Sequence, residues 1–327
     1  MKITSWAIFF VAILLFIFVR NQINQDANTQ NLLLQVQYNK SIDTATQDAA
    51  YALIANASQA KESQYQSAKN VRINKEEAIT TFFRTMYMNF NVTHDIVGQE
   101  QLNSYVPALV VVGYDGYYLY HFEEYKDANG NTMLKQVWSP KKPYAYRDNQ
   151  NNTYSFTLDN YVTINRASDK KKYEGFREDI QAEASIQFLN DPDKFDQVRR
   201  TTIVNTIQND LGYTINQYNT YSKRYGISYT FTVPYISNED WNNTINDAGV
   251  LAFVQGIPLG STYYNNYALG GARIIKKETF QGIDVEGRKF YYPSNTCQSS
   301  YSTEEVFTTA REAAQKGYIP LRCGIGN

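Results

Sequence analysis

The sequence predicts an α+β fold, because helical and extended patterns occupy separate blocks of the chain. Helical periodicity dominates residues 34–90, the alternation typical of strands dominates residues 108–164, and helix, strand and helix follow. An uncharged apolar run precedes them all. We therefore expect an N-terminal transmembrane helix, a long helical stalk, an antiparallel β-meander packed with helices, and a C-terminal helix held by a disulfide.

The apolar run covers residues 3–19, with Lys2 before it and Arg20 after it. Its length is near the lower limit for a helix that crosses a bilayer. A cleaved signal peptide is one alternative, but no A-x-A cut site follows the run. A buried helix of a soluble protein is another, although no comparably apolar segment exists to pair with it. We expect an uncleaved signal anchor in the cell membrane, single-pass, with the bulk of the chain extracytoplasmic.

Three domains follow from this interpretation. They are an anchor over residues 1–21, a helical stalk over 22–95 and an extracytoplasmic α+β domain over 96–327, with a further boundary near residue 180 as an alternative. The stalk helix is expected over residues 34–60, where apolar residues recur at steps of three or four: Leu34, Tyr38, Ile42, Ala45, Ala49 and Leu53. This face packs either on its own domain or on partner copies.

A second helix is expected over residues 78–90, capped by Asn74 with Glu77 three positions later. The pattern then becomes extended. Asp115 and Gly116 predict a tight hairpin turn, and the letters ANGN predict a second turn. Further strands are expected over residues 132–138, 153–158 and 160–165, so that one antiparallel meander results.

The second half of the chain mixes both patterns. A helix capped by Asp191 or Asp193 is expected to place Ile203, Ile207 and Leu211 on one face. The remaining expectations are a helix over 173–189, a strand over 227–236, a buried apolar segment over 249–259, a turn at Gly270 and Gly271, and a last helix over 303–316 that ends at Gly317.

Composition and motifs argue against several classes of function. The net charge of -1, without a basic stripe, disfavours nucleic-acid binding. The two histidines, His94 and His121, have no His or Cys neighbour at a metal spacing, and no nucleophile, phosphate-loop or dinucleotide motif occurs. The carboxylate pairs Glu123–Glu124 and Glu304–Glu305 are typical of solvated surface. We expect no catalytic residue, metal or cofactor, and a protein that is not an enzyme.

Tyrosine is abundant, with 28 residues. Tyr118 and Tyr120 share one face of a predicted strand, whereas a second group lies among asparagines and comprises Tyr263, Tyr264 and Tyr267. Aromatic rings beside amides can bind a sugar or a protein partner, so these five form a candidate partner surface. The alternative is a set of half-buried rings whose hydroxyls reach solvent.

The only two cysteines are Cys297 and Cys323. The stretch that contains them, with its E-A-A and G-Y-x-P letters, resembles the metal-binding module of Ada-type DNA-repair proteins. In that module C-x-x-C follows G-Y-x-P, but here Leu321 follows Pro320 and only Cys323 remains. With no further ligand in sight, we expect a disulfide rather than zinc, as suits an exported domain.

An anchor, a long helix, a β-meander and a C-terminal disulfide together are similar to the plan of pilin-like membrane-anchored surface proteins. The start MKITSWAIFF lacks the Gly cut site and the later Glu of a prepilin. The resemblance implies a non-enzymatic component of a surface assembly such as a pilus or secretion apparatus, with protein partners or self-association through the stalk. Two alternatives stay open: an extracytoplasmic ligand-binding domain of the Cache or PAS-like type, and a cell-envelope enzyme.

Overall fold

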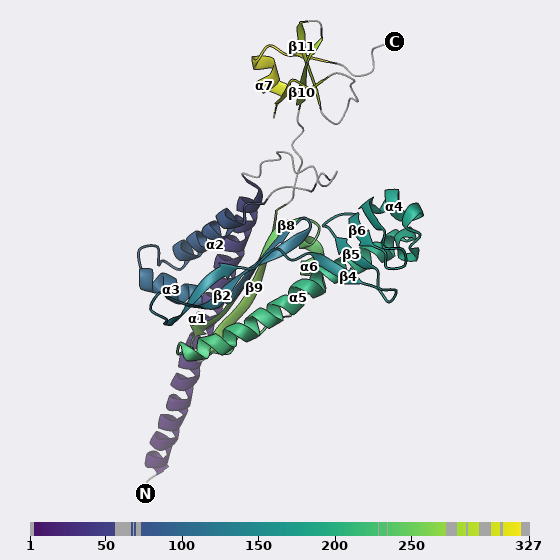
Figure 1. Ribbon diagram of the computed structural model, residues 1–327. Helices are drawn as coiled ribbons and strands as arrows, with labels where there is room; N and C mark the ends of the chain where they lie inside the picture. Colours follow the sequence, from purple (N-terminus) through teal and green to yellow (C-terminus); the bar gives the residue numbers. More distant parts are fainter. Residues whose placement is uncertain are drawn as a thin grey trace. The chain divides into compact units, whose positions relative to one another are not determined.

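The computed structural model describes residues 3–55, 67, 69, 73–227, 229–233, 235–272, 280–285, 287–293, 302–307 and 310–321, with the side chains of 3–5, 7–9 and 243 left out (Figure 1). The chain divides into two compact units, residues 1–274 and residues 275–327. The α+β class and the long N-terminal helix are confirmed.

Unit 1 is built on a five-stranded antiparallel sheet with the order β3-β2-β1-β8-β9. Its strands are β1 (Ala108–Gly113), β2 (Gly116–Lys126), β3 (Thr132–Trp138), β8 (Ala248–Leu259) and β9 (Thr262–Ala272). Gly113 pairs with Gly116 across the predicted tight turn. All six residues of β1 are buried, as befits a central strand with helices on both faces.

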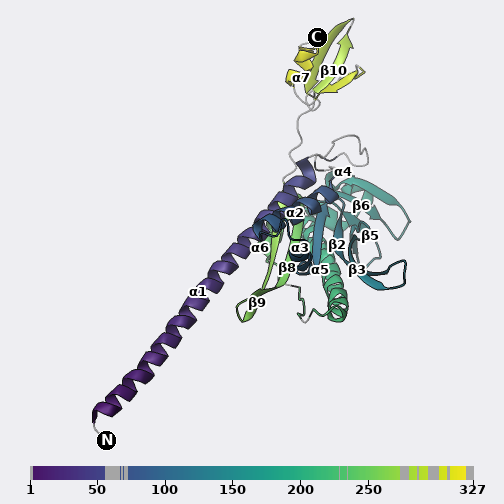
Figure 2. The ribbon, with the colours of Figure 1, turned by 90° about the vertical axis from the view of Figure 1, so that its left-hand side faces the viewer.

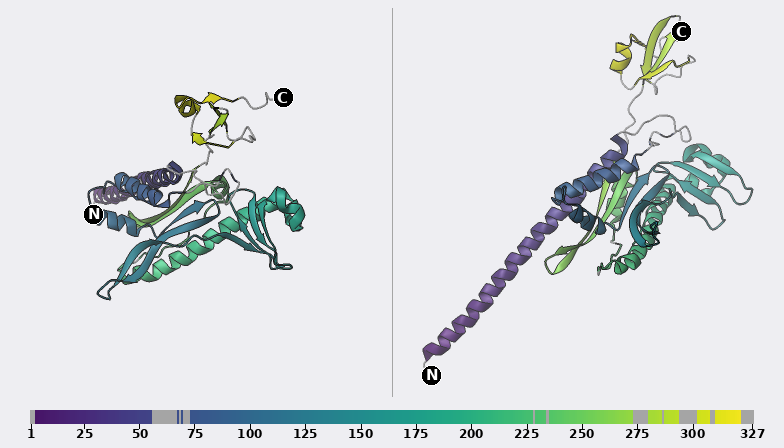
Figure 3. Two further views of the ribbon diagram at one scale, coloured as in Figure 1. Left: turned by 45° about the horizontal axis from the view of Figure 1, so that its top comes forward. Right: turned by 60° about the vertical axis from the view of Figure 1, so that its left-hand side comes forward.

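One face of this sheet is covered by α1 (Ile3–Ala55) and α2 (Lys75–Asn89), and the other by α5 (Pro192–Arg224) (Figure 3). The predicted stripe of α1 is buried: Ile42, Ala45, Ala49 and Leu53 are 0% exposed. This confirms that the stripe packs on its own domain. The Asn74 side chain accepts from the Glu77 N–H at 3.2 Å, so the predicted cap of α2 is confirmed as well.

The first part of α1 extends beyond the sheet (Figure 2), and its described side chains from Phe10 to Val36 are exposed or, at Asn31, half-buried. Within the described residues no helix has the length and apolarity needed to cross a membrane. The predicted transmembrane anchor and single-pass membrane location are therefore corrected. The physical reason is length: residues 3–19 span about 25 Å as a helix, against about 30 Å of hydrocarbon, and a polar stretch follows Arg20.

The predicted single meander is wrong, because the strands after Trp138 form a separate sheet with the order β4-β5-β6-β7. Pro140 and Pro143 interrupt the chain between the two sheets, since proline cannot donate to a ladder. The strands are β4 (Tyr144–Arg147), β5 (Thr153–Phe156), β6 (Tyr161–Asn165) and β7 (Lys172–Phe176). The helix expected over 173–189 is thus shortened to α4 (Arg177–Ala184), because β7 is recruited to the free edge of β6.

Helix α5 starts as predicted, with Asp191 accepting from the Lys194 N–H at 3.0 Å. The expected strand over 227–236 is absent from the described positions of that segment. Two side-chain amides hold its backbone instead. Asn219 exchanges two hydrogen bonds of 2.7 Å with Phe231, and Gln255 bonds both the N–H and the C=O of Thr232. Side chains therefore supply the pairing that a neighbouring strand supplies elsewhere.

The turn predicted at Gly270 and Gly271 is also wrong, because both residues lie inside β9. The glycines serve a close approach. A Cβ atom on Gly270 would lie 2.5 Å from the backbone oxygen of Thr46 in α1, and one on Gly249 would lie 2.7 Å from the Gly270 oxygen. Glycine here lets α1 settle directly on the sheet.

Unit 2 contains a small sheet with the order β12-β10-β11-β13. Its elements are β10 (Phe280–Val285), β11 (Arg288–Pro293), β12 (Glu305–Phe307), α7 (Ala310–Gln315) and β13 (Ile319–Pro320). The last helix is shorter than predicted because its expected start is strand β12, which pairs with β10. Gly317 follows α7 with φ of 84°, the conformation expected of a C-cap glycine.

The predicted disulfide is not found in the described part of the chain. Cys297 and Cys323 both lie outside the described residues. The fold expectation that included this staple is corrected accordingly, and the short core of unit 2 is instead formed by Phe307, Ala313 and Tyr318.

Candidate functional site

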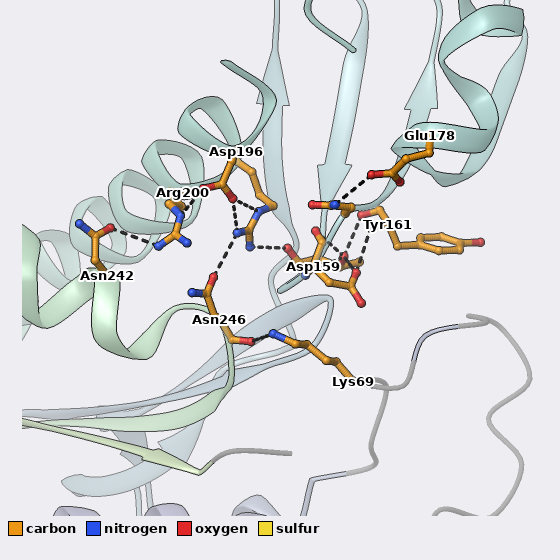
Figure 4. A network of polar contacts seen from close by, with 11 residues as sticks. Lys69, Asp159, Tyr161, Glu178, Asp196, Arg200, Asn242 and Asn246 are labelled. Carbon is orange, nitrogen blue, oxygen red and sulfur yellow. Dashed lines mark hydrogen bonds and ion pairs between the residues drawn. The ribbon is translucent and has the colours of Figure 1, made fainter. Parts of the chain in front are cut away.

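A network of polar contacts that includes Asp159, Asp196 and Asn246 links α5 to the second sheet (Figure 4), and Arg199 of α5 contacts three of its groups. Its side chain is only 3% exposed. The guanidinium donates to Oδ1 of Asp196 at 2.5 Å, to Oδ1 of Asn246 at 3.2 Å and to the backbone oxygen of Thr157 at 3.4 Å. One buried cation thus joins α5, the end of β5 and the turn that leads into β8.

Asp196 lies one helical turn before Arg199 and also accepts from Nε of Arg200 at 2.6 Å. Burial opposes ionisation of Asp196, but the hydrogen bonds from Arg199 and Arg200 outweigh it and hold the pKa of this carboxyl below its ordinary value. Arg200 continues to Oδ1 of Asn242 at 3.3 Å, in α6 (Asn238–Thr244). Asp196 is therefore ionised at neutral pH and accepts hydrogen bonds from two guanidinium groups, those of Arg199 and Arg200.

Asp159, in the turn between β5 and β6, forms the other half of the network. Its Oδ1 accepts from the Tyr114 hydroxyl at 2.9 Å, the Thr157 hydroxyl at 2.8 Å and the Tyr161 N–H at 3.0 Å. Its Oδ2 accepts from the Ser67 hydroxyl. Asp159 therefore connects the two sheets with the segment before α2.

The network reaches the protein surface at two further contacts. Lys69 donates to the backbone oxygen of Asn246 at 2.6 Å, and Asn160 donates to Oε1 of Glu178 at 3.1 Å. Asp159 and Asp196 each accept several hydrogen bonds from groups of other elements or of the same helix, and these contacts hold the two sheets and α5 in position.

None of these residues was singled out from the sequence, although a local signal exists for three of them. Asp196, Arg199 and Arg200 stand at helical spacings of three and four, which predicts ion pairs along one helix. Asn246 and Thr157 carry no signal of this kind, since they meet Arg199 only through the fold.

The five tyrosines of the candidate partner surface are not brought together. Tyr118 and Tyr120 lie beside Trp138, with Tyr120 near Phe83 of α2. Tyr264 is 2% exposed beneath α1, and Tyr267 lies on the opposite face, where its hydroxyl donates to Asp240 at 2.7 Å. Tyr263 alone is largely exposed, at 51%, with its ring 5.1 Å from that of Tyr229.

The remaining chemical candidates lie apart as well. Among the described residues no group of three or more His, Cys, Asp or Glu is arranged to hold a metal ion. Glu123 is exposed, whereas Glu124 is paired with Arg224 at 2.9 Å. A cavity of about 10 Å³ lies between α6 and the sheet, lined by Val112, Trp241, Thr244, Ile245, Gly249, Val250 and Leu269. Pockets for small molecules are larger, at about 300 to 1,000 Å³.

Comparisons of this chain with protein-family models, with curated proteins and with solved structures found no match. Functional inference therefore rests on the contacts and exposed surfaces of the chain itself.

Proposed function

We propose that this protein is a non-enzymatic component of a multi-subunit assembly, and that it attaches to neighbouring subunits through the leading segment of α1, residues 6–36. The exposed large apolar side chains of this segment support the proposal. They are 38% to 67% exposed and comprise Trp6, Phe10, Val11, Ile13, Leu14, Leu15, Phe16, Ile17, Phe18, Val19, Ile23, Leu32, Leu33, Leu34 and Val36. Exposed apolar surface on this scale marks an interaction site.

The arrangement of these side chains indicates the kind of neighbour. From Phe10 to Val19 every residue is apolar and exposed, so the apolar surface surrounds the helix rather than forming one stripe. A single partner helix covers one stripe, whereas a helix that is apolar all round belongs inside a larger structure. Several neighbouring helices packed around this segment would bury it.

The second half of α1 supports a role in orienting unit 1 relative to the neighbouring subunits. The same helix continues into the core of unit 1, where Ile42, Ala49 and Leu53 are fully buried. A subunit held by the leading segment is therefore oriented by one continuous helix. The resemblance to pilin-like proteins implies the same arrangement, in which the first part of a long helix binds other subunits and the second part packs on its own domain.

The test is the oligomeric state of the full-length chain, measured by sedimentation over a concentration series. The double variant L15E/F16E should associate at least tenfold more weakly than the unaltered protein, so that its assemblies dissociate at concentrations at least tenfold higher. The control Tyr213→Glu, at a tyrosine of α5 that is 63% exposed, should associate as the unaltered protein does. A full-length chain that stays monomeric, in solution or bound to lipid vesicles, would refute the proposal.

A further inference from the structure

In the part of unit 1 that the structure describes, no strand pairs with the outer edge of β9, since β9 ends the five-stranded sheet on the side away from β3. The direction of its backbone groups follows from two contacts outside the ladder. The backbone N–H of Tyr267 donates to Oδ1 of the adjacent Asn266 at 2.9 Å. The backbone oxygen of Gly271 accepts from Nε2 of Gln47 at 3.1 Å. Backbone groups alternate in direction along a strand, so alternate residues face outward: Tyr263, Asn265, Tyr267, Leu269 and Gly271.

The register with β8 agrees with this assignment. The backbone N–H of Gln255 donates to the Tyr105 oxygen at 2.9 Å, on the side of β8 away from β9, so the backbone N–H and C=O groups of odd-numbered residues of β8 point away from β9. The backbone groups of its even-numbered residues then point toward β9, where Ala252 pairs with Ala268. The backbone N–H and C=O of Asn265 and Leu269 are left without a hydrogen-bond partner among the described residues.

An open edge of this kind is a template for another strand, and proteins commonly protect such edges with charge. The other edge strands of unit 1 carry charged residues: Lys135 in β3, Arg147 in β4, and Lys172 and Glu174 in β7. Strand β9, with the sequence TYYNNYALGGA, carries none. Its edge is also long, at 11 residues. Nothing in its sequence repels a pairing strand.

The order of residue sizes along β9 identifies the partner. Tyr263, which is 51% exposed, stands near its start, and Gly271 stands near its end on the same face, whereas Tyr264 and Gly270 are covered by α1. An antiparallel second copy of the same strand sets bulky against small at both ends, with Tyr267 on the two-fold axis. We propose that β9 pairs edge to edge with β9 of a second copy of this chain, which joins the two five-stranded sheets into one sheet.

In this register Tyr263 lies opposite Gly271 of the second copy, and Asn265 lies opposite Leu269. Both are hydrogen-bonded pairs, because these residues face outward in each copy. This inference rests on the proposed assembly and adds a second interface to it, formed by residues 263–271 rather than by the leading segment of α1. Either interface can therefore be disproved without disproving the other.

The test uses the full-length chain with L15E/F16E, so that association through α1 does not contribute. Amide hydrogen exchange is measured with residue resolution over a hundredfold range of protein concentration. The amides of Asn265 and Leu269 should exchange at least tenfold more slowly at the highest concentration, while that of Leu251 in the ladder of β8 should not change. Equal exchange of Asn265 and Leu269 at all concentrations would overturn the proposal.

Two substitutions at one position provide the matched comparison. Leu269→Pro removes an N–H that points away from β8, which an edge strand tolerates, whereas Leu269→Ala removes the same side chain and keeps the N–H. Sedimentation should show a dimer for Leu269→Ala and at least tenfold weaker dimerisation for Leu269→Pro. Equal dimerisation of the two variants would overturn the proposal. Protection of the Leu251 amide in both variants shows that the sheet itself is retained.

Discussion

The Tyr264 hydroxyl donates to Oδ1 of Asn39 at 2.6 Å, and this bond ties α1 to the last strand of the sheet. The same amide oxygen accepts from Nδ2 of Asn266 at 2.8 Å. The exposed leading segment and the buried stripe of α1 meet at this point, because Tyr38 is the first half-buried aromatic residue among the described side chains of the helix, with its ring 5.4 Å from that of Tyr264. The bond between Tyr264 and Asn39 therefore fixes α1 on the sheet at the point where its buried stripe begins.

The substitution Tyr264→Phe should lower the free energy of unfolding by about 1 kcal/mol, because one buried hydrogen bond is lost while the ring stays. Chemical denaturation at pH 7 measures the change. The control is Tyr263→Phe, at the adjacent exposed tyrosine, which should change stability by less than about 0.5 kcal/mol. Equal effects of the two substitutions would contradict the assigned bond.

Alkaline pH should separate the same variant from the unaltered protein. Burial raises the pKa of Tyr264 to about 12, from 10.0. Because the folded pKa lies above the unfolded one, the contribution of Tyr264 is intact below pH 10 and is lost as the pH rises toward 12. The stability of Tyr264→Phe should therefore fall less steeply between pH 10 and pH 12, which denaturation across that range measures.

Gly270 should tolerate no side chain. Gly270→Ala places a Cβ atom 2.5 Å from the Thr46 oxygen, so α1 must move and stability should fall by about 1 to 3 kcal/mol. Gly271→Ala is the control, because its Cβ atom meets Thr244 at an ordinary 3.5 Å. Thermal unfolding compares the two, and a Gly271 variant that is less stable than the Gly270 variant would contradict the account.

Local signals in the sequence predicted local structure well, as the caps at Asn74 and Asp191 and the turn at Asp115 show. Predictions failed where partners distant in sequence decide the outcome. The residues 172–176 become a strand because β6 offers a free edge, and Gly270 lies within a strand because α1 needs close approach. A single-sequence pattern holds neither piece of information.

The candidate network shows the same limit. Charge spacing on α5 predicts that Asp196 and Arg199 interact, but the buried position of Arg199 follows from the sheet and from the α6 turn that enclose it. The tyrosines of β9 depend on the fold in the same way, because strand alternation sends Tyr264 and Tyr267 to opposite faces of the sheet although they are close in sequence.

Acid should destabilise the protein partly through Asp196. Its pKa is held below the ordinary 3.8, so its contribution is complete above that value and is lost as the pH falls below it. Asp196→Asn should cost about 2 kcal/mol at neutral pH, because Arg199 loses a charged partner, and should flatten the loss of stability below pH 4. The control Gln197→Ala, at an exposed and uncharged position of α5, should leave the loss of stability in acid as it is in the unaltered protein.

The backbone of residues 229–233 is held by side-chain amides instead of a neighbouring strand, and substitutions of these amides test that account. Asn219→Leu removes the amide that pairs with Phe231, and Gln255→Leu removes the amide that pairs with Thr232. Each substitution should accelerate exchange of its own partner's backbone amide at least tenfold and affect the other less, because the two clamps come from different elements, α5 and β8. Asn216→Leu, at an exposed position of α5, should change neither rate. If both amides respond equally to either substitution, the segment is released as one unit, and the ring contact of Phe231 with Tyr218 at 4.9 Å holds it rather than the two amides.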